Sequence, residues 1–123
     1  MAAIISVHEY VLKPGTDESR FEQALQDAAA RGLLRLPGLI GYHFVKGIRG
    51  VRHGGYAAIW VYESRAAWEA LWGPPERPRA AKDYPAVWQV WENEVLAPFL
   101  CQEPDRISFT TYEELEPHGS GER

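Results

Sequence analysis

The sequence predicts an α+β protein whose elements follow the order β-α-β-β-α(α)-β. The prediction depends on two apolar periodicities, one of two residues and one of three to four, and on Gly- and Pro-containing breaks between them. With right-handed crossovers, this order gives a ferredoxin-like, four-stranded antiparallel sheet with helices on one face. The length of 123 residues fits one domain.

Four segments show the period-two alternation of β-strands. They are residues 3–12, 39–48, 54–64 and 106–115. The third strand, GGYAAIWVYES, is unusual because both of its faces are apolar. One face is largely aromatic and carries Tyr56, Ala58, Trp60 and Tyr62, whereas the other carries aliphatic side chains such as Ile59.

Three further segments show helical spacing of apolar residues. They are residues 17–36, 64–72 and 87–99. Thr16 or Asp17 can cap the first helix, Gly32 can end it early, and Ser64 can cap the second. The Pro-rich segment 73–85 separates the second and third helices, and we expect it to form a surface rim or lid.

Composition excludes several classes of function. The net charge is −4 and the basic residues form no block, so neither nucleic acid nor an anionic membrane is an expected partner. Cys101 is the single cysteine, which excludes an intrachain disulfide. We expect one domain over residues 1–115 and a flexible tail over 116–123. With neither a signal peptide nor a membrane-spanning run, a cytoplasmic location is expected.

Strands that are apolar on both faces predict a homodimer. If helices cover the aliphatic face, the aromatic face is left open, together with His8 and Tyr10 of the first strand. An exposed apolar patch of that size is rare on soluble monomers. We therefore expect a second copy to cover it, so that two sheets enclose an aromatic lumen.

The segments HEYVLKPGTDESRFEQAL, LPGLIGYHF and IWVYESRAAWEALW resemble successive signatures of the dimeric α+β barrel superfamily. Within it, the chain is similar to the antibiotic biosynthesis monooxygenase domain and to the NIPSNAP-like branch. The resemblance covers residues 3–72 and implies a dimeric barrel. Haem-degrading members place a histidine ligand beyond the helix that follows the third strand, where residues 74–85 contain none. Haem chemistry is therefore disfavoured, and we expect neither a cofactor nor a metal.

Several side chains of the aromatic face are candidates for chemistry. His8 can act as a proton acceptor, because an unperturbed histidine titrates near neutral pH. Tyr10 and Tyr62 would orient a substrate anion, and Trp60 would stack on it. The alternative for His8 is a hydrogen-bonded histidine that only supports the barrel. Candidate ligand-binding residues are Ser6, Tyr56, Ala58, Trp60, His43 and Trp72.

These residues predict a cofactor-independent monooxygenase that acts on a planar phenolic or polyketide-like molecule. The alternative is a non-catalytic protein of the same fold that binds a small molecule or another protein. Nucleotide-binding, zinc-protease and serine-hydrolase motifs are absent from the sequence. The ENE run at 92–94 is expected to face outward without a function.

Overall fold

The computed structural model describes residues 2–116. Its strands are β1 (Ile4–Tyr10), β2 (Leu39–Lys46), β3 (Tyr56–Tyr62) and β4 (Phe109–Glu113). Its α-helices are α1 (Glu18–Ala30), α2 (Arg65–Trp72) and α3 (Ala86–Val90), and a π-helical segment over Trp91–Leu96 extends α3. The strands pair antiparallel in the order β2-β3-β1-β4, as the ferredoxin-like topology requires.

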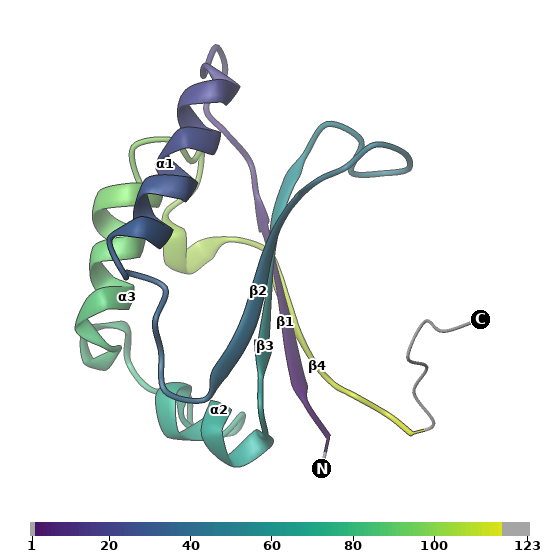
Figure 1. The fold of residues 1–123 in the computed structure, drawn as a ribbon, viewed down its shortest axis with the longest axis vertical. Helices are drawn as coiled ribbons and strands as arrows, with labels where there is room; N and C mark the ends of the chain where they lie inside the picture. Colours follow the sequence, from purple (N-terminus) through teal and green to yellow (C-terminus); the bar gives the residue numbers. More distant parts are fainter. Residues whose placement is uncertain (1, 117–123) are drawn as a thin grey trace.

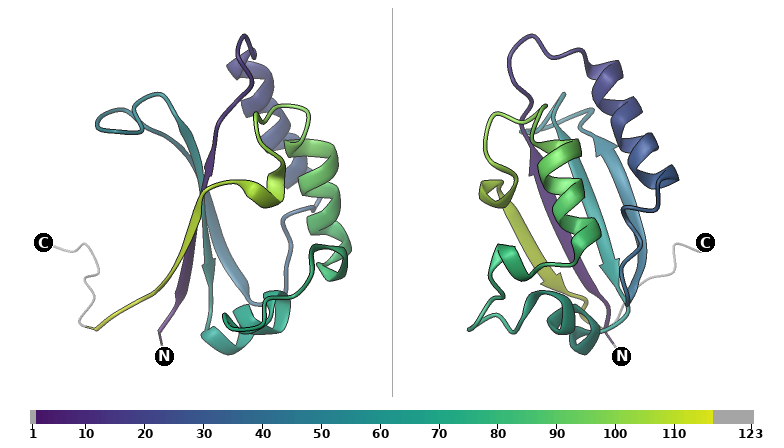
Figure 2. Two further views of the ribbon diagram at one scale, coloured as in Figure 1. Left: turned by 180° about the vertical axis from the view of Figure 1, so that it is seen from behind. Right: turned by 90° about the vertical axis from the view of Figure 1, so that its left-hand side faces the viewer.

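Helices α1 and α3 lie side by side over one face of the sheet, and α2 lies at one end of it (Figures 1 and 2). No element within residues 2–116 covers the opposite face, which we call the open face. The predicted fold class is therefore confirmed. The tail predicted for 116–123 falls almost entirely outside the described residues.

The predicted caps fix where two of the helices begin. The Asp17 carboxylate accepts the Ser19 amide of α1 at 3.0 Å, and the Ser64 hydroxyl accepts the Ala67 amide of α2 at 3.1 Å. Each satisfies an amide that has no partner within its own helix. Gly32 has φ +76°, a conformation that suits glycine, and it stops the first helix as predicted.

The prediction of which sheet face the helices cover is wrong. Trp60 and Ala58 are fully buried beneath the helices, and the Trp60 ring lies 5.1 Å from Trp88 and 6.1 Å from Trp91. The physical reason is that the helices themselves present aromatic rings to the sheet, including Phe21 of α1. Aromatic pairs gain from edge-to-face contact in addition to burial, so the aromatic face of the sheet packs against them.

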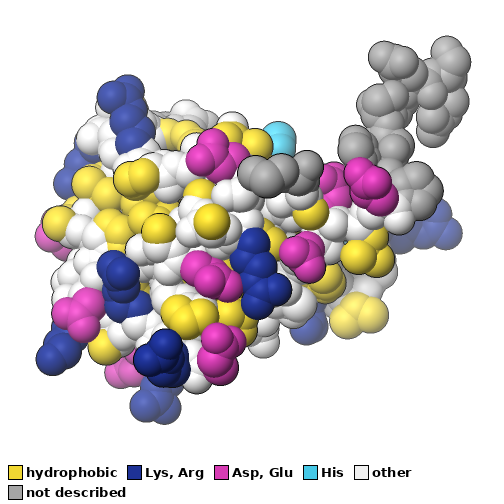
Figure 3. All heavy atoms as spheres, turned by 90° about the horizontal axis from the view of Figure 1, so that it is seen from below, with side chains coloured by type: hydrophobic (Ala, Val, Ile, Leu, Met, Phe, Trp, Pro, Cys, Tyr) yellow, Lys and Arg dark blue, Asp and Glu magenta, His cyan; other side chains and the backbone are white. Residues whose placement is uncertain are grey.

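The open face is consequently aliphatic. It carries Ile5, Val7, Ile59 and Val61, which are only partly buried. Val45 and Tyr112, whose side chains lie on the same face, remain 40% and 54% exposed. Figure 3 views the molecule from below, along the strands, and on that side apolar side chains lie among charges of both signs.

Candidate ligand-binding site

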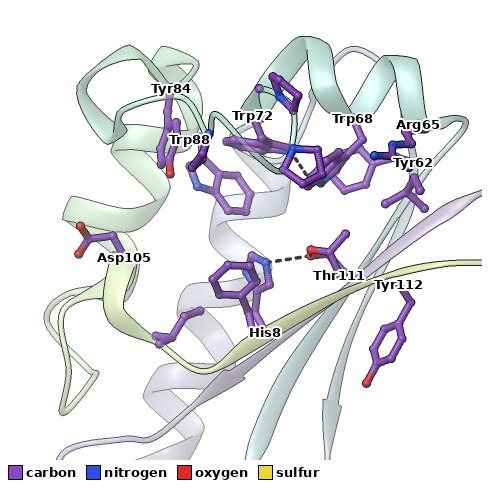
Figure 4. A pocket seen from close by; sticks show the side chains of 18 of the residues that line it. His8, Tyr62, Arg65, Trp68, Trp72, Tyr84, Trp88, Asp105, Thr111 and Tyr112 are labelled. Carbon is purple, nitrogen blue, oxygen red and sulfur yellow. Dashed lines mark hydrogen bonds between the residues drawn. The ribbon is translucent and has the colours of Figure 1, made fainter.

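A cavity of about 500 Å³ lies between the sheet and its helices, within a single chain. Strands β1 and β4 form its floor, and α2, α3 and residues 73–85 form its walls. Figure 4 shows Tyr84, Trp88 and Trp72 on one side, with His8 and Thr111 facing them. A volume of this size is typical of small-molecule sites.

The floor is a short polar row set among apolar side chains. Ser6 and His8 follow each other on the inward face of β1, and Thr111 is the register partner of Ser6 on β4. The Ser6 and Thr111 hydroxyls are hydrogen-bonded at 2.7 Å, and Ser6 Oγ lies 3.4 Å from His8 Nε2. The alternation of β1 thus brings a hydroxyl and an imidazole to the same cavity.

His8 is neutral at physiological pH. Burial lowers its pKa from 6.5 to about 4, because the charged imidazolium would lose its hydration. Its ring is surrounded by Trp60, Trp88 and Phe109, with centroids 6.0, 6.1 and 5.7 Å away. A neutral imidazole can accept a proton, although one with so low a pKa is a weak base.

Three aromatic side chains form the wall opposite His8. The Trp72 ring lies 5.1 Å from Tyr84 and 5.2 Å from Trp88, in edge-to-face contact with each. Trp72 Nε1 donates a hydrogen bond of 3.2 Å to the Tyr62 hydroxyl. Burial raises the pKa of Tyr62, so this hydroxyl keeps its proton and can itself donate to a ligand.

Glu92 is a cavity residue that sequence reasoning missed. It lies on the π-helical segment that follows α3 and lines the cavity, contrary to the prediction that ENE faces outward. Asn93 and Glu94 are exposed as expected. Burial raises the pKa of Glu92 to about 7, an effect that Asp105 strengthens and a hydrogen bond from Trp88 reduces. The sequence did contain a signal for this position: Glu92 follows Trp88 by four residues, and residues four apart lie on one face of a helix.

The Pro-rich segment 73–85 supplies one wall of the cavity. Gly73, Pro74, Pro75, Pro78 and Tyr84 all line it. Gly73 has φ +83°, and a Cβ atom there would lie only 2.7 Å from the carbonyl oxygen of Arg77. Glycine at this position therefore lets the segment fold back onto the end of α2.

The sequence-predicted site residues divide into three groups. Ser6, His8, Tyr62 and Trp72 line the cavity together. Tyr10, Tyr56, Ala58 and Trp60 are buried in the core and do not line it. His43 is exposed, and its side chain lies on the open face.

The two core tyrosines occupy different surroundings. Tyr56 donates a hydrogen bond to the Glu22 carboxylate of α1. Burial raises the pKa of Tyr56 to about 12. The Tyr10 hydroxyl is fully buried, and burial raises its pKa as well. Both hydroxyls are therefore protonated, and neither is placed to touch a molecule in the cavity.

Within residues 2–116, no three His, Cys, Asp or Glu side chains gather as they would around a metal ion. None of the helices there is long and apolar enough to cross a membrane.

The described residues form a ferredoxin-like α+β fold with an aromatic-walled cavity beside the sheet. Solved structures of several other proteins are similar to it in fold. A candidate antibiotic biosynthesis monooxygenase from Bordetella bronchiseptica has 14% identity and a TM-score of 0.63, over 94% of this chain and 99% of that one. SnoaB, a cofactor-independent oxygenase from Streptomyces nogalater, has 13% identity and a TM-score of 0.55, over 99% and 100%.

A NIPSNAP-like domain protein from Burkholderia xenovorans has 18% identity and a TM-score of 0.56, over 95% of this chain and 89% of that one. No protein-family model matches the chain, and no curated protein matches its sequence. The chain therefore has the fold of these three proteins, which confirms the structural resemblance drawn from its sequence.

Proposed function

We propose that the protein is a cofactor-independent monooxygenase that oxidises a planar phenolic compound inside this cavity. The main observation in support of this proposal is the neutral His8 on the floor of an aromatic-walled cavity of about 500 Å³. Aromatic walls favour a flat ligand, and the neutral imidazole is a proton acceptor within reach of it. The likeness to SnoaB, which is described as a cofactor-independent oxygenase, supports the proposal.

The reaction needs only the substrate and dioxygen. The substrate is a phenolic compound whose ring system carries an activated CH₂ group. His8 Nε2 takes a proton from the phenol or from this CH₂ group, and the resulting anion supplies electrons to dioxygen. A carbon–oxygen bond forms at the CH₂ carbon, and both of its C–H bonds break. One oxygen atom stays on the carbon as a carbonyl, and the other leaves as water with the two hydrogens. The carbon is oxidised and dioxygen is reduced.

The low pKa of His8 restricts the substrate. A weak base can deprotonate only a compound whose anion is strongly delocalised, which favours a fused phenolic ring system. The protonated Tyr62 hydroxyl, held by Trp72, is placed to donate a hydrogen bond to that anion. The mainly apolar walls then limit the contact of the anion with water.

The same low pKa favours the alternative, a non-catalytic small-molecule-binding protein. In that case the hydrogen-bonded Ser6 and His8 only orient the ligand. Dioxygen consumption separates the two functions, because binding alone consumes none.

The open face supports a homodimer as the working form. It presents a row of aliphatic side chains on β1 and β3, flanked by exposed Val45 and Tyr112. A second copy of the same face is a partner of matching chemistry, since each apolar row would cover the other. The cavity lies on the other side of the sheet, so each protomer would keep its own site.

An oxygen electrode tests the catalytic proposal, with 1,8-dihydroxyanthrone as the probe. We expect protein-dependent dioxygen uptake that His8→Ala reduces by about 10²-fold, the usual scale for loss of a general base. His43→Ala changes a histidine on the open face and is the matched control, with uptake unchanged. Uptake that is equal in wild type and His8→Ala would remove His8 from the mechanism. Saturable binding without uptake would establish the binding alternative.

A further inference from the structure

The charges that line the cavity are unequal in sign. Three carboxylates line it, from Glu92, Asp105 and Glu113, against one permanent cation, Arg65. The Arg65 guanidinium is already paired with Glu69, Nε to Oε2 at 2.9 Å. Because His8 is neutral, an empty cavity carries a net negative potential.

The carboxylates of Glu92 and Asp105 gather at the aromatic wall. Both line the cavity together with Tyr84, Glu92 as a half-buried side chain and Asp105 as an exposed one at its edge. Figure 4 shows Asp105 beside the cavity on the side of Tyr84 and Trp88. No salt bridge to Glu92 or Asp105 forms among the described residues.

This combination is the chemistry that recognises an organic cation. Trp72 contacts both Tyr84 and Trp88 edge to face, so its ring plane is steeply inclined to each of theirs at one corner of the cavity. The face of an aromatic ring attracts a cation, and a nearby unpaired carboxylate adds to that attraction. An anionic group placed at this corner would instead be repelled by the two carboxylates.

We propose that the cavity selects planar aromatic ligands that carry a positive charge, held between the Trp72–Tyr84–Trp88 corner and the carboxylates of Glu92 and Asp105. The inference rests on the proposed function in using the same cavity, and it adds the charge of the substrate. The phenolic end of such a molecule would lie towards His8, and its ammonium or ring-nitrogen cation towards Glu92.

Three bicyclic probes of similar shape test the selection at about pH 8, where Glu92 is ionised. They are N-methylquinolinium, which is cationic, 4-methylquinoline, which is neutral, and 1-naphthoate, which is anionic. Binding is followed by quenching of tryptophan fluorescence and by calorimetry. We expect the cation to bind about tenfold more tightly than the neutral probe, as one to two kcal/mol of cation–π and carboxylate attraction implies. The anion should bind more weakly than both.

Glu92→Gln should reduce the advantage of the cation over the neutral probe to about threefold or less, with binding of the neutral probe kept. Glu94→Gln removes an exposed carboxylate from the same helical segment and should leave the advantage unchanged. Asp105→Asn is a second variant with the same expected direction, in case Glu92→Gln does not fold.

Equal affinity for the cationic and neutral probes in the wild type would overturn the charge selection and leave the cavity as a ligand site. Failure of all three probes to bind would overturn both the selection and the site. An advantage of the cation that survives both Glu92→Gln and Asp105→Asn would show that these carboxylates do not select it, and would also overturn the inference.

Discussion

Replacing Glu92 by glutamine tests whether a desolvated carboxylate lies in the cavity wall. Glutamine keeps the shape of the protonated side chain and cannot ionise. In the folded protein burial raises the pKa of Glu92 from 4.5 to about 7. The folded state therefore binds this proton more tightly than the unfolded state does. Between those two pH values the wild type must lose stability as pH rises, because folding favours the protonated form.

The size of the effect follows from the two pKa values. At about 1.4 kcal/mol per pKa unit, the difference corresponds to about 3.5 kcal/mol. Glu92 is only partly buried, so solvent screening reduces this to about 1.5 kcal/mol. Below about pH 4 the wild type and Glu92→Gln should be equally stable, and above about pH 7.5 the variant should be the more stable by that amount.

Urea unfolding, followed by tryptophan fluorescence at fixed protein concentration over this pH range, measures the difference. Glu94→Gln removes an exposed carboxylate from the same segment and should follow the wild-type pH profile. A constant difference between wild type and Glu92→Gln at every pH, or a wild type that is the more stable at high pH, would refute the burial of the Glu92 carboxylate.

Three further predictions follow from other parts of the structure. The pH dependence of stability from His8 has the opposite sign, because burial lowers its pKa from 6.5 to about 4. The wild type should lose at most about 3.5 kcal/mol of stability as pH falls through that window, and urea unfolding of His8→Gln should show no such loss. Ser64→Ala removes the cap of α2 and should cost about 1 kcal/mol in the same assay, whereas Ser64→Gly should cost less. Ile59→Lys places a charge on the open face and should convert a dimer into a monomer, as judged by light scattering after gel filtration; a wild type that is already monomeric would contradict the dimer.

The sequence predicted the elements more successfully than their arrangement in space. Alternation and caps located every strand and the starts of α1 and α2, because those signals are local. When both faces of a sheet are apolar, the local sequence of a strand does not determine which face packs against the helices. In β3 the decision depends on Trp88 and Trp91, some thirty residues further along the chain, whose rings pack on Trp60.

The same limit explains the outcome for the candidate site. Ser6, His8 and Tyr62 were predicted because they share one face of the sheet, and they do line the cavity. Trp60 and Tyr10 share that face too, but α1 and α3 cover them and leave no room for a ligand. Glu92 and Tyr84 reach the cavity from a helix and a loop whose positions only the tertiary fold defines.

The central claim is that the ligand site lies under the helices and not on the open face of the sheet. Histidine NMR tests it directly, since His8 lines the cavity and His43 lies on the open face. Imidazole signals, assigned with His8→Gln and His43→Gln, would be followed while 1,8-dihydroxyanthrone is added without dioxygen. The account predicts that the His8 signals shift saturably and that those of His43 stay unchanged. Saturable shifts of His43 with an unmoved His8 would place the ligand on the open face and contradict the account.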